Sequence, residues 1–479
     1  MSRCLIKWPS GNISEPFQSS WLKPLKSVLI STYELGRQPF GLASPAAWLR
    51  RAGCEVTCLD LSCQTLDEET IRSAGLIALY VPMHTATRLA AQLIPTIRKL
   101  NPSAHLCCYG LYAPVNEAFL RKLGVETILG GEFEESLVRT FERLRDSRDP
   151  QAGQLLPTVS VARQTFLPPE RQSLPPLSRY AKLVWDDGEQ QIVGYTEASR
   201  GCKHRCRHCP IVPVYNGIFR VVQPEVVLED IRRQLAMGAT HITFGDPDFF
   251  NGIGHAIKIV TALHAEHPAV TYDVTIKVEH LLKHAEFLPT LRKSGCAFVT
   301  SAVESLDDEV LHRLDKGHTR CHFVRALELC RQAGLEISPT FVAFTPWTTL
   351  ENYCGFISGL QQLDLVDRIA PIQLGIRLLI PAGSRLLELE EIAGMVGRYD
   401  ETALVFPWRN RDPRVDELCA RVQQMIHEGG KQKETRRQIF NRVAARAFEA
   451  AGLRPPDRLE SADRLDRAAV PYLTEPWYC

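Results

Sequence analysis

Residues 199–210 read SRGCKHRCRHCP, and this stretch decides how the rest of the chain is interpreted. It places Cys202, Cys206 and Cys209 in a C-x3-C-x2-C spacing, in a loop directly after an apolar segment at 192–197 that we predict to be a strand. Three thiolates this close in sequence can ligate one face of an iron–sulfur cubane, which normally has four cysteine ligands. One iron then lacks a protein ligand, and an open coordination position is typical of catalytic rather than structural metal sites.

The same loop allows two other interpretations. His204 and His208 are spaced His-x-x-x-His, and either could be the fourth ligand of a tetrahedral zinc ion. An incidental group of cysteines is the other alternative. The neighbouring cations Lys203, Arg205 and Arg207 are expected to lower the pKa values of the thiols and to offset the negative charge of a cluster.

The sequence after this loop alternates between predicted strands and helices. The strands of these six βα units are expected at 192–197, 241–244, 271–276, 297–302, 336–342 and 372–379. Tandem units of this kind form either an open sheet or a barrel, and barrels place their chemistry in the loops after the strands. The alternation alone does not choose between the two, and the cysteine loop lies after the first strand, where a barrel would place its chemistry. We place this βα region at 188–395.

A similar alternation precedes the loop. Strands are expected at 27–31, 55–59, 75–80, 105–109 and 126–129. Strands that alternate with helices predict a parallel sheet covered on both faces, so residues 1–147 are expected to form a doubly wound α/β domain. The proline-rich stretch 148–187 is interpreted as a linker. Strands are expected to stop near residue 395, and 396–479 is interpreted as a helical region with helices at 416–427 and 433–451.

Composition limits the class of protein. The chain has 479 residues, a net charge of +1, 45% apolar and 23% charged residues, which is typical of a soluble globular protein with two or three domains. Nothing in it calls for nucleic acid or a membrane as partner. We find neither the apolar core of a secretory signal nor an apolar run of about 18 residues, so a cytoplasmic location with reduced thiols is expected.

The cysteine loop followed by βα units resembles the radical S-adenosylmethionine (SAM) superfamily, and the resemblance covers about 192–380. The resemblance implies that residues 188–395 form a partial (β/α)6 TIM-type barrel. It implies that Cys202, Cys206 and Cys209 hold a [4Fe-4S] cluster, whose fourth iron is chelated by the amino and carboxylate groups of SAM. One electron would then split the sulfonium and generate a carbon radical. It also implies a small-molecule substrate and an electron donor such as flavodoxin or ferredoxin. The residue before the third cysteine is usually aromatic in this family, whereas here it is His208, which can still contact adenine.

The resemblance points to further cofactor-binding residues at the carboxyl ends of the strands. Gly245, Asp246 and Asp248 occupy the place where the family binds the methionyl ammonium, and a carboxylate can accept hydrogen bonds from that cation. Ser301 and Glu304 occupy the place where it binds the ribose. A plain βα turn and the start of a helix are the respective alternatives. Three weaker candidates for substrate contacts are Lys277, Thr340 and Arg377.

The N-terminal region resembles the cobalamin-binding domain that often precedes radical SAM barrels. Gly36, Gly130 and Gly131 follow its first and fifth strands, where glycine would let backbone approach a cofactor. The usual D-x-H-x-x-G motif is absent, because Ser31 and Tyr33 stand at the matching offsets. Two alternatives stay open: cobalamin binds without a histidine ligand, or the domain has lost the cofactor and serves as a scaffold.

The last six residues, TEPWYC, resemble the end of a radical SAM group named for its CUAEP or CCAEP tail. One hypothesis is that translation continues through a UGA codon read as selenocysteine, and the alternative is a natural end with a lone thiol. Two adjacent chalcogens including Cys479, a tentative catalytic residue, could hold a soft acceptor such as trivalent arsenic. The expected function is transfer of a SAM-derived carbon group to a small molecule. The alternatives are a cobalamin-dependent radical SAM methyltransferase and a non-enzymatic metal or iron–sulfur sensor module.

Overall fold

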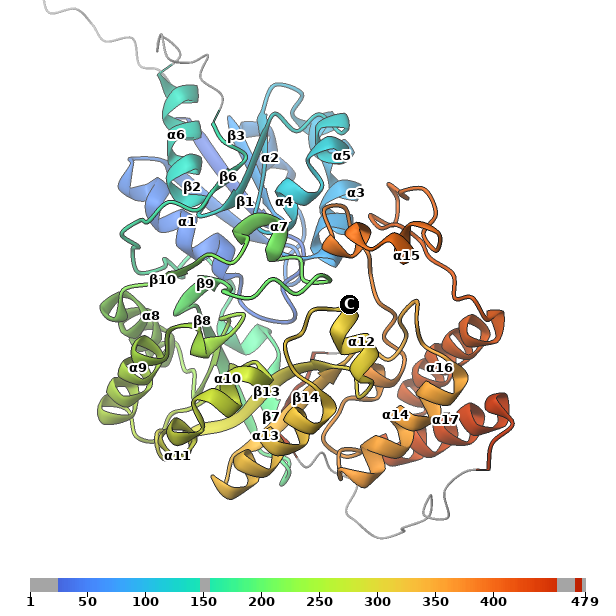
Figure 1. The fold of residues 1–479 in the computed structure, drawn as a ribbon. Helices are drawn as coiled ribbons and strands as arrows, with labels where there is room; N and C mark the ends of the chain where they lie inside the picture. Colours follow the sequence, from blue (N-terminus) through green and yellow to red (C-terminus); the bar gives the residue numbers. More distant parts are fainter. Residues whose placement is uncertain (1–24, 147–155, 455–469, 476–479) are drawn as a thin grey trace, which may run out of the picture.

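The computed structural model describes residues 25–146, 156–454 and 470–475 of the chain. These residues form two β-sheets covered by helices, one from the N-terminal part of the chain and one from its middle, as Figure 1 shows. The short segments β9 (Ser199–Gly201), β10 (Phe219–Val221) and α7 (Val212–Tyr215) lie between the two parts.

The first sheet is parallel, with strand order β2-β1-β3-β4-β5-β6. Its strands are β1 (Lys26–Ser31), β2 (Glu55–Asp60), β3 (Leu76–Tyr80), β4 (His105–Tyr109), β5 (Thr127–Gly131) and β6 (Val159–Ser160). Side chains alternate between the two faces, so Leu29 packs with α1 (Phe40–Arg51) and α6 (Glu134–Arg145), while Ile30 packs with α3 (His84–Leu100). The remaining helices of this part are α2 (Glu68–Ser73), α4 (Tyr112–Val115) and α5 (Glu117–Lys122). The predicted doubly wound fold is confirmed.

The second sheet contains five parallel strands in the order β14-β13-β12-β11-β8, flanked by β7 and β15. These are β8 (Gln190–Thr196), β11 (His241–Phe244), β12 (Thr271–Thr275), β13 (Cys296–Glu304) and β14 (Glu336–Phe341), with β7 (Lys182–Val184) and β15 (Tyr472–Leu473) antiparallel at the edge. The helices that follow the strands are α8 (Pro224–Ala236), α9 (Ile253–Glu266), α10 (Val278–Lys283), α11 (Leu288–Lys293), α12 (Asp308–Arg313), α13 (Arg320–Gln332) and α14 (Leu350–Gln362). The curved α/β architecture and the helical C-terminal part, with α16 (Pro413–Gln432) and α17 (Arg436–Ala451), are confirmed.

Two expected features of the second part are wrong. The strand predicted at 372–379 is a short 3-10 helix, Pro371–Leu374, followed by a single parallel bridge between Phe344 and Arg377. Proline cannot donate a ladder hydrogen bond, which explains why the apolar run does not begin as a strand. Strands also do not stop at 395, because β15 pairs with β7.

Residues 156–187, interpreted as part of a linker, connect the two sheets physically. This segment adds β6 to the first sheet and β7 to the second. The proposed domain boundaries at 147, 187 and 395 stay a prediction. Among the described residues, no helix combines the length and the apolar character needed to span a lipid bilayer.

Arg171 of this segment makes a buried contact with both parts of the chain. Its guanidinium donates to both carboxylate oxygens of Asp230 on α8, at 2.7 and 2.9 Å, and to the carbonyl oxygen of Tyr195 on β8 at 2.7 Å. A further hydrogen bond of 2.9 Å reaches Gln38 in the loop after β1. The side chains of Arg171 and Asp230 are both 1% exposed, so neither charge has access to water as an alternative partner.

We expect Asp230→Ala to destabilise the chain by about 3–5 kcal/mol, because it leaves the Arg171 charge buried and unpaired. The measurement is the free energy of unfolding from urea denaturation followed by circular dichroism. Arg232→Ala is the matched control, since Arg232 on the same helix pairs with Glu266 at the surface and its loss should cost at most about 1 kcal/mol. Equal losses for the two variants would contradict the importance of the buried pair.

Candidate active site

The cysteine loop begins at a two-stranded ribbon at the carboxyl end of β8. Strands β9 (Ser199–Gly201) and β10 (Phe219–Val221) pair antiparallel. Gly201 has a φ of +73°, and a Cβ there would lie 2.5 Å from the carbonyl oxygen of Ile218, so only glycine fits this turn. Directly after it, Cys202 and Cys206 are buried and Cys209 is half-buried.

The expected effect of the flanking cations on the thiols is not found. Burial raises the pKa of Cys202, and it raises the pKa of Cys209 to about 12. Two of the flanking cations are engaged elsewhere: Lys203 lies over the ring of Phe219 at 4.8 Å, and Arg207 donates to the carbonyl oxygens of the last two residues of α12.

Two buried lysines from distant parts of the sequence face the thiols instead. The Nζ atom of Lys277, after β12, lies 3.7 Å from the Sγ atom of Cys206. Lys316, after α12, is 3% exposed, and its charge interacts with both Cys206 and Cys209. Burial opposes the charge on Lys316, but Glu304 and the two cysteines raise its pKa overall. Sequence reasoning rated Lys277 as a weak candidate and missed Lys316, which belongs to no motif around the strands.

The two candidate aspartates after β11 have different roles. Asp246 is buried and accepts hydrogen bonds from the backbone of Ala198 at 2.9 Å and the hydroxyl of Ser199 at 2.5 Å, so it holds the start of the cysteine loop. Burial raises its pKa to about 7, against those two hydrogen bonds. Gly245 allows close packing, because a Cβ there would lie 1.9 Å from the hydroxyl of Tyr195.

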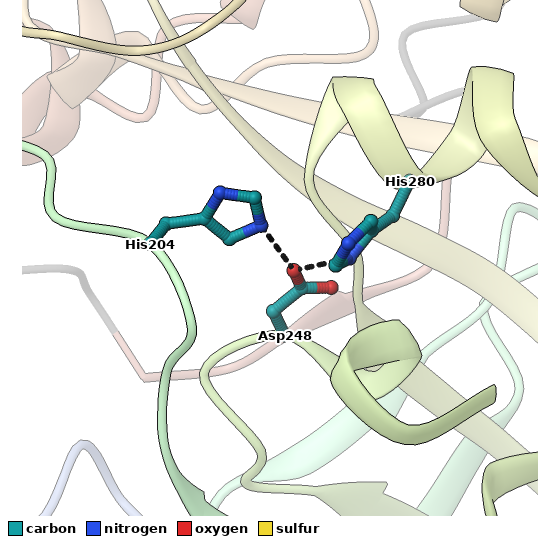
Figure 2. Close-up of side chains that lie close together, drawn as sticks. All are labelled: His204, Asp248 and His280. Carbon is teal, nitrogen blue, oxygen red and sulfur yellow. Dashed lines mark ion pairs between the residues drawn. The ribbon is translucent and has the colours of Figure 1, made fainter. Parts of the chain in front are cut away.

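Asp248 is the carboxylate that is available to a cation. Figure 2 shows it between two imidazoles, with Nδ1 of His280 at 2.7 Å and Nε2 of His204 at 3.5 Å from its Oδ2 atom. Burial opposes ionisation of Asp248, but contact with His204 and His280 lowers its pKa to about 2. The three ligand atoms lie within 4.8 Å of one another, and none has a well-formed hydrogen bond, so the group could bind a metal ion or a cationic substituent of a ligand. Sequence reasoning missed His280.

Glu304 lies on the other side of the loop, at the end of β13. It adopts a φ of +69°, and its Oε1 atom contacts Nε2 of His208 at 3.1 Å and Nζ of Lys316 at 3.3 Å. Burial opposes ionisation, but Lys316 and His208 hold the pKa of Glu304 well below its usual range. The nearby hydroxyl of Ser301 is buried without a hydrogen-bond partner.

The remaining candidates divide into those near the loop and those elsewhere. His204 and His208, the proposed fourth zinc ligands, face carboxylates rather than the thiols. Arg377 pairs with Asp416 on α16 and lies against the ring of Trp408, so its role is structural. Thr340 lies on β14, and Cys479 lies outside the described residues.

The residues around the loop fit a [4Fe-4S] cluster. The thiol of Cys209 lies close enough to Cys202 and Cys206 for their charges to interact, and two buried ammonium groups lie beside these thiols. A buried cation is stable only beside compensating negative charge. Glu279, 2.6 Å from Lys277, and Glu304, 3.3 Å from Lys316, provide part of that charge, and thiolates bound to a cluster would add to it.

Comparison with known proteins agrees with this geometry. Residues 196–349 match the family model described as the Radical SAM superfamily. The hopanoid C-3 methylase of Methylococcus capsulatus is 24% identical over 321 residues, which are 65% of this chain and 62% of the relative. A putative methylthiotransferase of Methanocaldococcus jannaschii is 20% identical over 58% of this chain and 62% of its own length. The chain therefore spans less than two thirds of the length of these relatives.

Solved structures share the fold. The radical SAM methyltransferase TsrM from Kitasatospora setae, with cobalamin and a [4Fe-4S] cluster bound, is 18% identical with a TM-score of 0.57, covering 71% of this chain and 73% of that one. The cobalamin-dependent SAM radical enzyme OxsB, with aqua-cobalamin and SAM bound, is 14% identical with a TM-score of 0.62, covering 85% and 67%. Residues 196–349 thus form a radical SAM domain, and proteins of that superfamily use a [4Fe-4S] cluster and SAM.

Proposed function

We propose that Cys202, Cys206 and Cys209 ligate the [4Fe-4S] cluster at which this enzyme cleaves SAM reductively. The observation that carries the proposal is the placement of these thiols beside the buried charges of Lys277 and Lys316, at the carboxyl ends of the parallel strands. Carboxyl ends of strands are where α/β folds bind ligands. When bound, the cluster would supply one electron to the sulfonium of SAM and break a carbon–sulfur bond.

The residues around the thiols are suited to hold SAM. The pKa of Asp248 is lowered, and its Oδ2 atom has no hydrogen-bond partner, so we assign this carboxylate to the methionyl ammonium. Asp246 already accepts hydrogen bonds from the start of the cysteine loop. Glu304 would accept hydrogen bonds from ribose hydroxyls, and His208 beside it would contact the adenine. The imidazoles of His204 and His280 position the Asp248 carboxylate from two sides.

The substrate is proposed to be a small molecule that receives a SAM-derived carbon group, with a flavodoxin or ferredoxin as electron donor in the cytoplasm. The methylase among the relatives and the methyltransferase among the structural neighbours support group transfer. A thiol-held acceptor such as trivalent arsenic stays a hypothesis from the tail sequence. A cobalamin-dependent methyltransferase is the alternative that the comparisons raise, because TsrM and OxsB bind cobalamin, and it would require a corrinoid site at the N-terminal sheet.

We expect Cys206→Ala to abolish both cluster assembly and SAM cleavage, because two thiolates cannot retain the cubane. The measurements are iron and sulfide content after anaerobic reconstitution, about four of each per wild-type chain by cubane stoichiometry, and reductant-dependent release of 5′-deoxyadenosine or methylthioadenosine. Cys321→Ala is the matched control, since Cys321 is exposed on α13. Turnover retained by Cys206→Ala would overturn the assignment.

Variants of Asp248 and Asp246 are expected to have different effects, because we assign Asp248 to SAM binding and Asp246 to support of the cysteine loop. Asp248→Asn should keep its iron content but weaken SAM binding roughly tenfold or more, because it removes a charge-assisted hydrogen bond of about 1.5–3 kcal/mol. Asp246→Asn should instead lower iron content, since it loosens Ala198 and Ser199. SAM affinity can be measured by equilibrium dialysis of reconstituted protein. Unchanged affinity in Asp248→Asn would exclude its assignment to the ammonium.

A further inference from the structure

The N-terminal sheet has the strand order of folds that bind ligands outside the carboxyl ends of their strands, at the point where the order reverses. In this chain that point lies between β1 and β3, and the edge continues along β4 and β5. A corrinoid shared between this sheet and the cysteine loop would have to lie against this edge. The contacts along it therefore test whether the residues present fit cobalamin.

Protein atoms occupy the point between β1 and β3 where the strand order reverses. The hydroxyl of Thr32, after β1, donates to the carbonyl oxygen of Ala86 at the start of α3, at 3.0 Å, which joins the two loops directly. Gly36 packs under the segment before β7: a Cβ there would lie 2.9 Å from Ala181 and 2.8 Å from Glu475. The backbone N–H of Ala181 also donates to the carbonyl oxygen of Gly36 at 2.8 Å.

The two glycines at the end of β5 are also packed against protein atoms. A Cβ on Gly130 would lie 2.1 Å from the ring of Pro114, and one on Gly131 would lie 2.1 Å from the carbonyl oxygen of Ser160. Strand β6 pairs with these two glycines. The close approach that the glycines permit is therefore made by protein atoms of α4 and β6.

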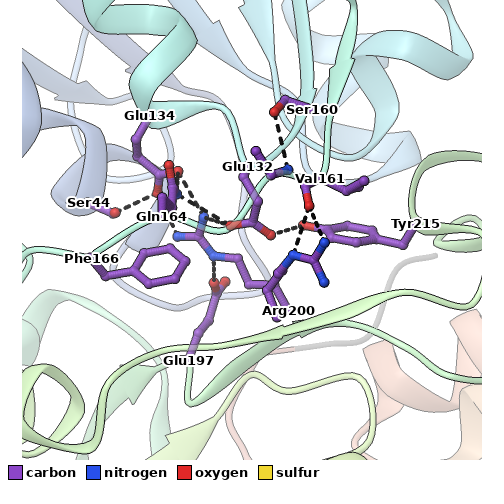
Figure 3. A network of polar contacts seen from close by, with 12 residues as sticks. Ser44, Glu132, Glu134, Ser160, Val161, Gln164, Phe166, Glu197, Arg200 and Tyr215 are labelled. Atoms are coloured by element: carbon purple, nitrogen blue, oxygen red, sulfur yellow. Dashed lines mark hydrogen bonds and ion pairs between the residues drawn. The ribbon is translucent and has the colours of Figure 1, made fainter.

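The space between this edge and the cysteine loop holds the side chain of Arg200, two residues before Cys202 (Figure 3). Its guanidinium pairs with Glu134 at 2.7 and 3.0 Å, with Glu132 at 3.3 Å and with Glu197 at 2.8 Å. The rings of Phe40, Phe133 and Phe166 lie within 5.5 Å of its Cζ atom.

The segment after the third cysteine closes the same region. Helix α7 (Val212–Tyr215) contacts both β5 and α4, and the hydroxyl of Tyr215 donates to Glu132 at 3.1 Å. Burial raises the pKa of Glu132 to about 7, with a smaller contribution from the charges of Glu134 and Glu197, whereas Arg200 lowers it. Inserting a large ring system here would separate these charges and leave them buried without partners.

We infer that this chain binds no cobalamin, and that the carboxyl edge of its N-terminal sheet instead anchors the cluster loop through Arg200. Arg200 is a positioning residue. Its contacts described above are with three glutamates and three phenylalanine rings, and through them it fixes the backbone two residues before Cys202. The anchoring half of the inference rests on the cluster assignment proposed above, whereas the absence of a corrinoid does not.

The first test is corrinoid content. The full chain is produced in cells supplied with cobalamin, purified without oxygen, incubated with aquacobalamin with and without SAM, and desalted. Cobalt analysis and the corrinoid absorption band should match a protein-free blank, while TsrM treated in parallel retains cobalamin. Stoichiometric cobalt on this chain would overturn the inference. Iron content and SAM cleavage are read on the same samples, so failure of the proposed function appears separately.

The second test addresses the anchor. Arg200→Gln should fold, as judged by circular dichroism, but its reduced cluster should show an altered electron paramagnetic resonance spectrum and a weaker spectral response to SAM. Arg232→Gln, which breaks an exposed arginine–glutamate pair on α8, should match the wild type in both readouts. An Arg200→Gln spectrum that is identical to wild type with and without SAM would show that the anchor has no effect on the loop.

Discussion

The site depends on one buried guanidinium. Arg200 lies on β9, the strand directly before the cysteine loop, and its side chain extends into the N-terminal part of the chain. There its guanidinium forms ion pairs with Glu132 and Glu134, which follow β5. A buried arginine that loses its partners costs about 3–5 kcal/mol, so the ribbon cannot shift independently of the N-terminal sheet. Because Cys202 follows two residues later, the register of the cysteine loop is set by the contact between the two parts of the chain rather than by the barrel alone.

The buried positive charges beside the cysteine loop favour a negatively charged ligand there. Lys277 and Lys316 are both buried beside the thiols, and among the described residues Glu279 and Glu304 are the carboxylates that pair with them. Burial, reinforced by these lysines, lowers the pKa of the neighbouring His318 to about 4, which keeps that imidazole neutral. Each lysine therefore has one carboxylate partner and also faces the thiols, so the two cations would favour a negatively charged ligand at this place. A thiolate-ligated cluster would be such a ligand.

Sequence patterns predicted the parts of this structure that local chemistry determines. Alternation of apolar strands and amphipathic helices gave the parallel sheets, and the spacing of Cys202, Cys206 and Cys209 located the site. The errors arose where distant parts of the chain decide the outcome. The segment at 372–379 has strand-like residues, but Pro371 prevents pairing at its start. Lys316 and His280 reach the site only through the packing of α10 and α12 on the barrel, and no local pattern marks them.

The glycines after the N-terminal strands show why a fold does not carry its cofactor with it. Glycine at the end of a strand signals that some group approaches the backbone closely, and the sequence does not say which group it is. In this chain Gly130 and Gly131 admit Pro114 and the strand β6, so the signal that is typical of a cofactor site is accounted for by protein packing. The hydrophobic cores on the two faces of the sheet depend on the strand order, whereas the carboxyl edge lies outside them and can hold a different occupant.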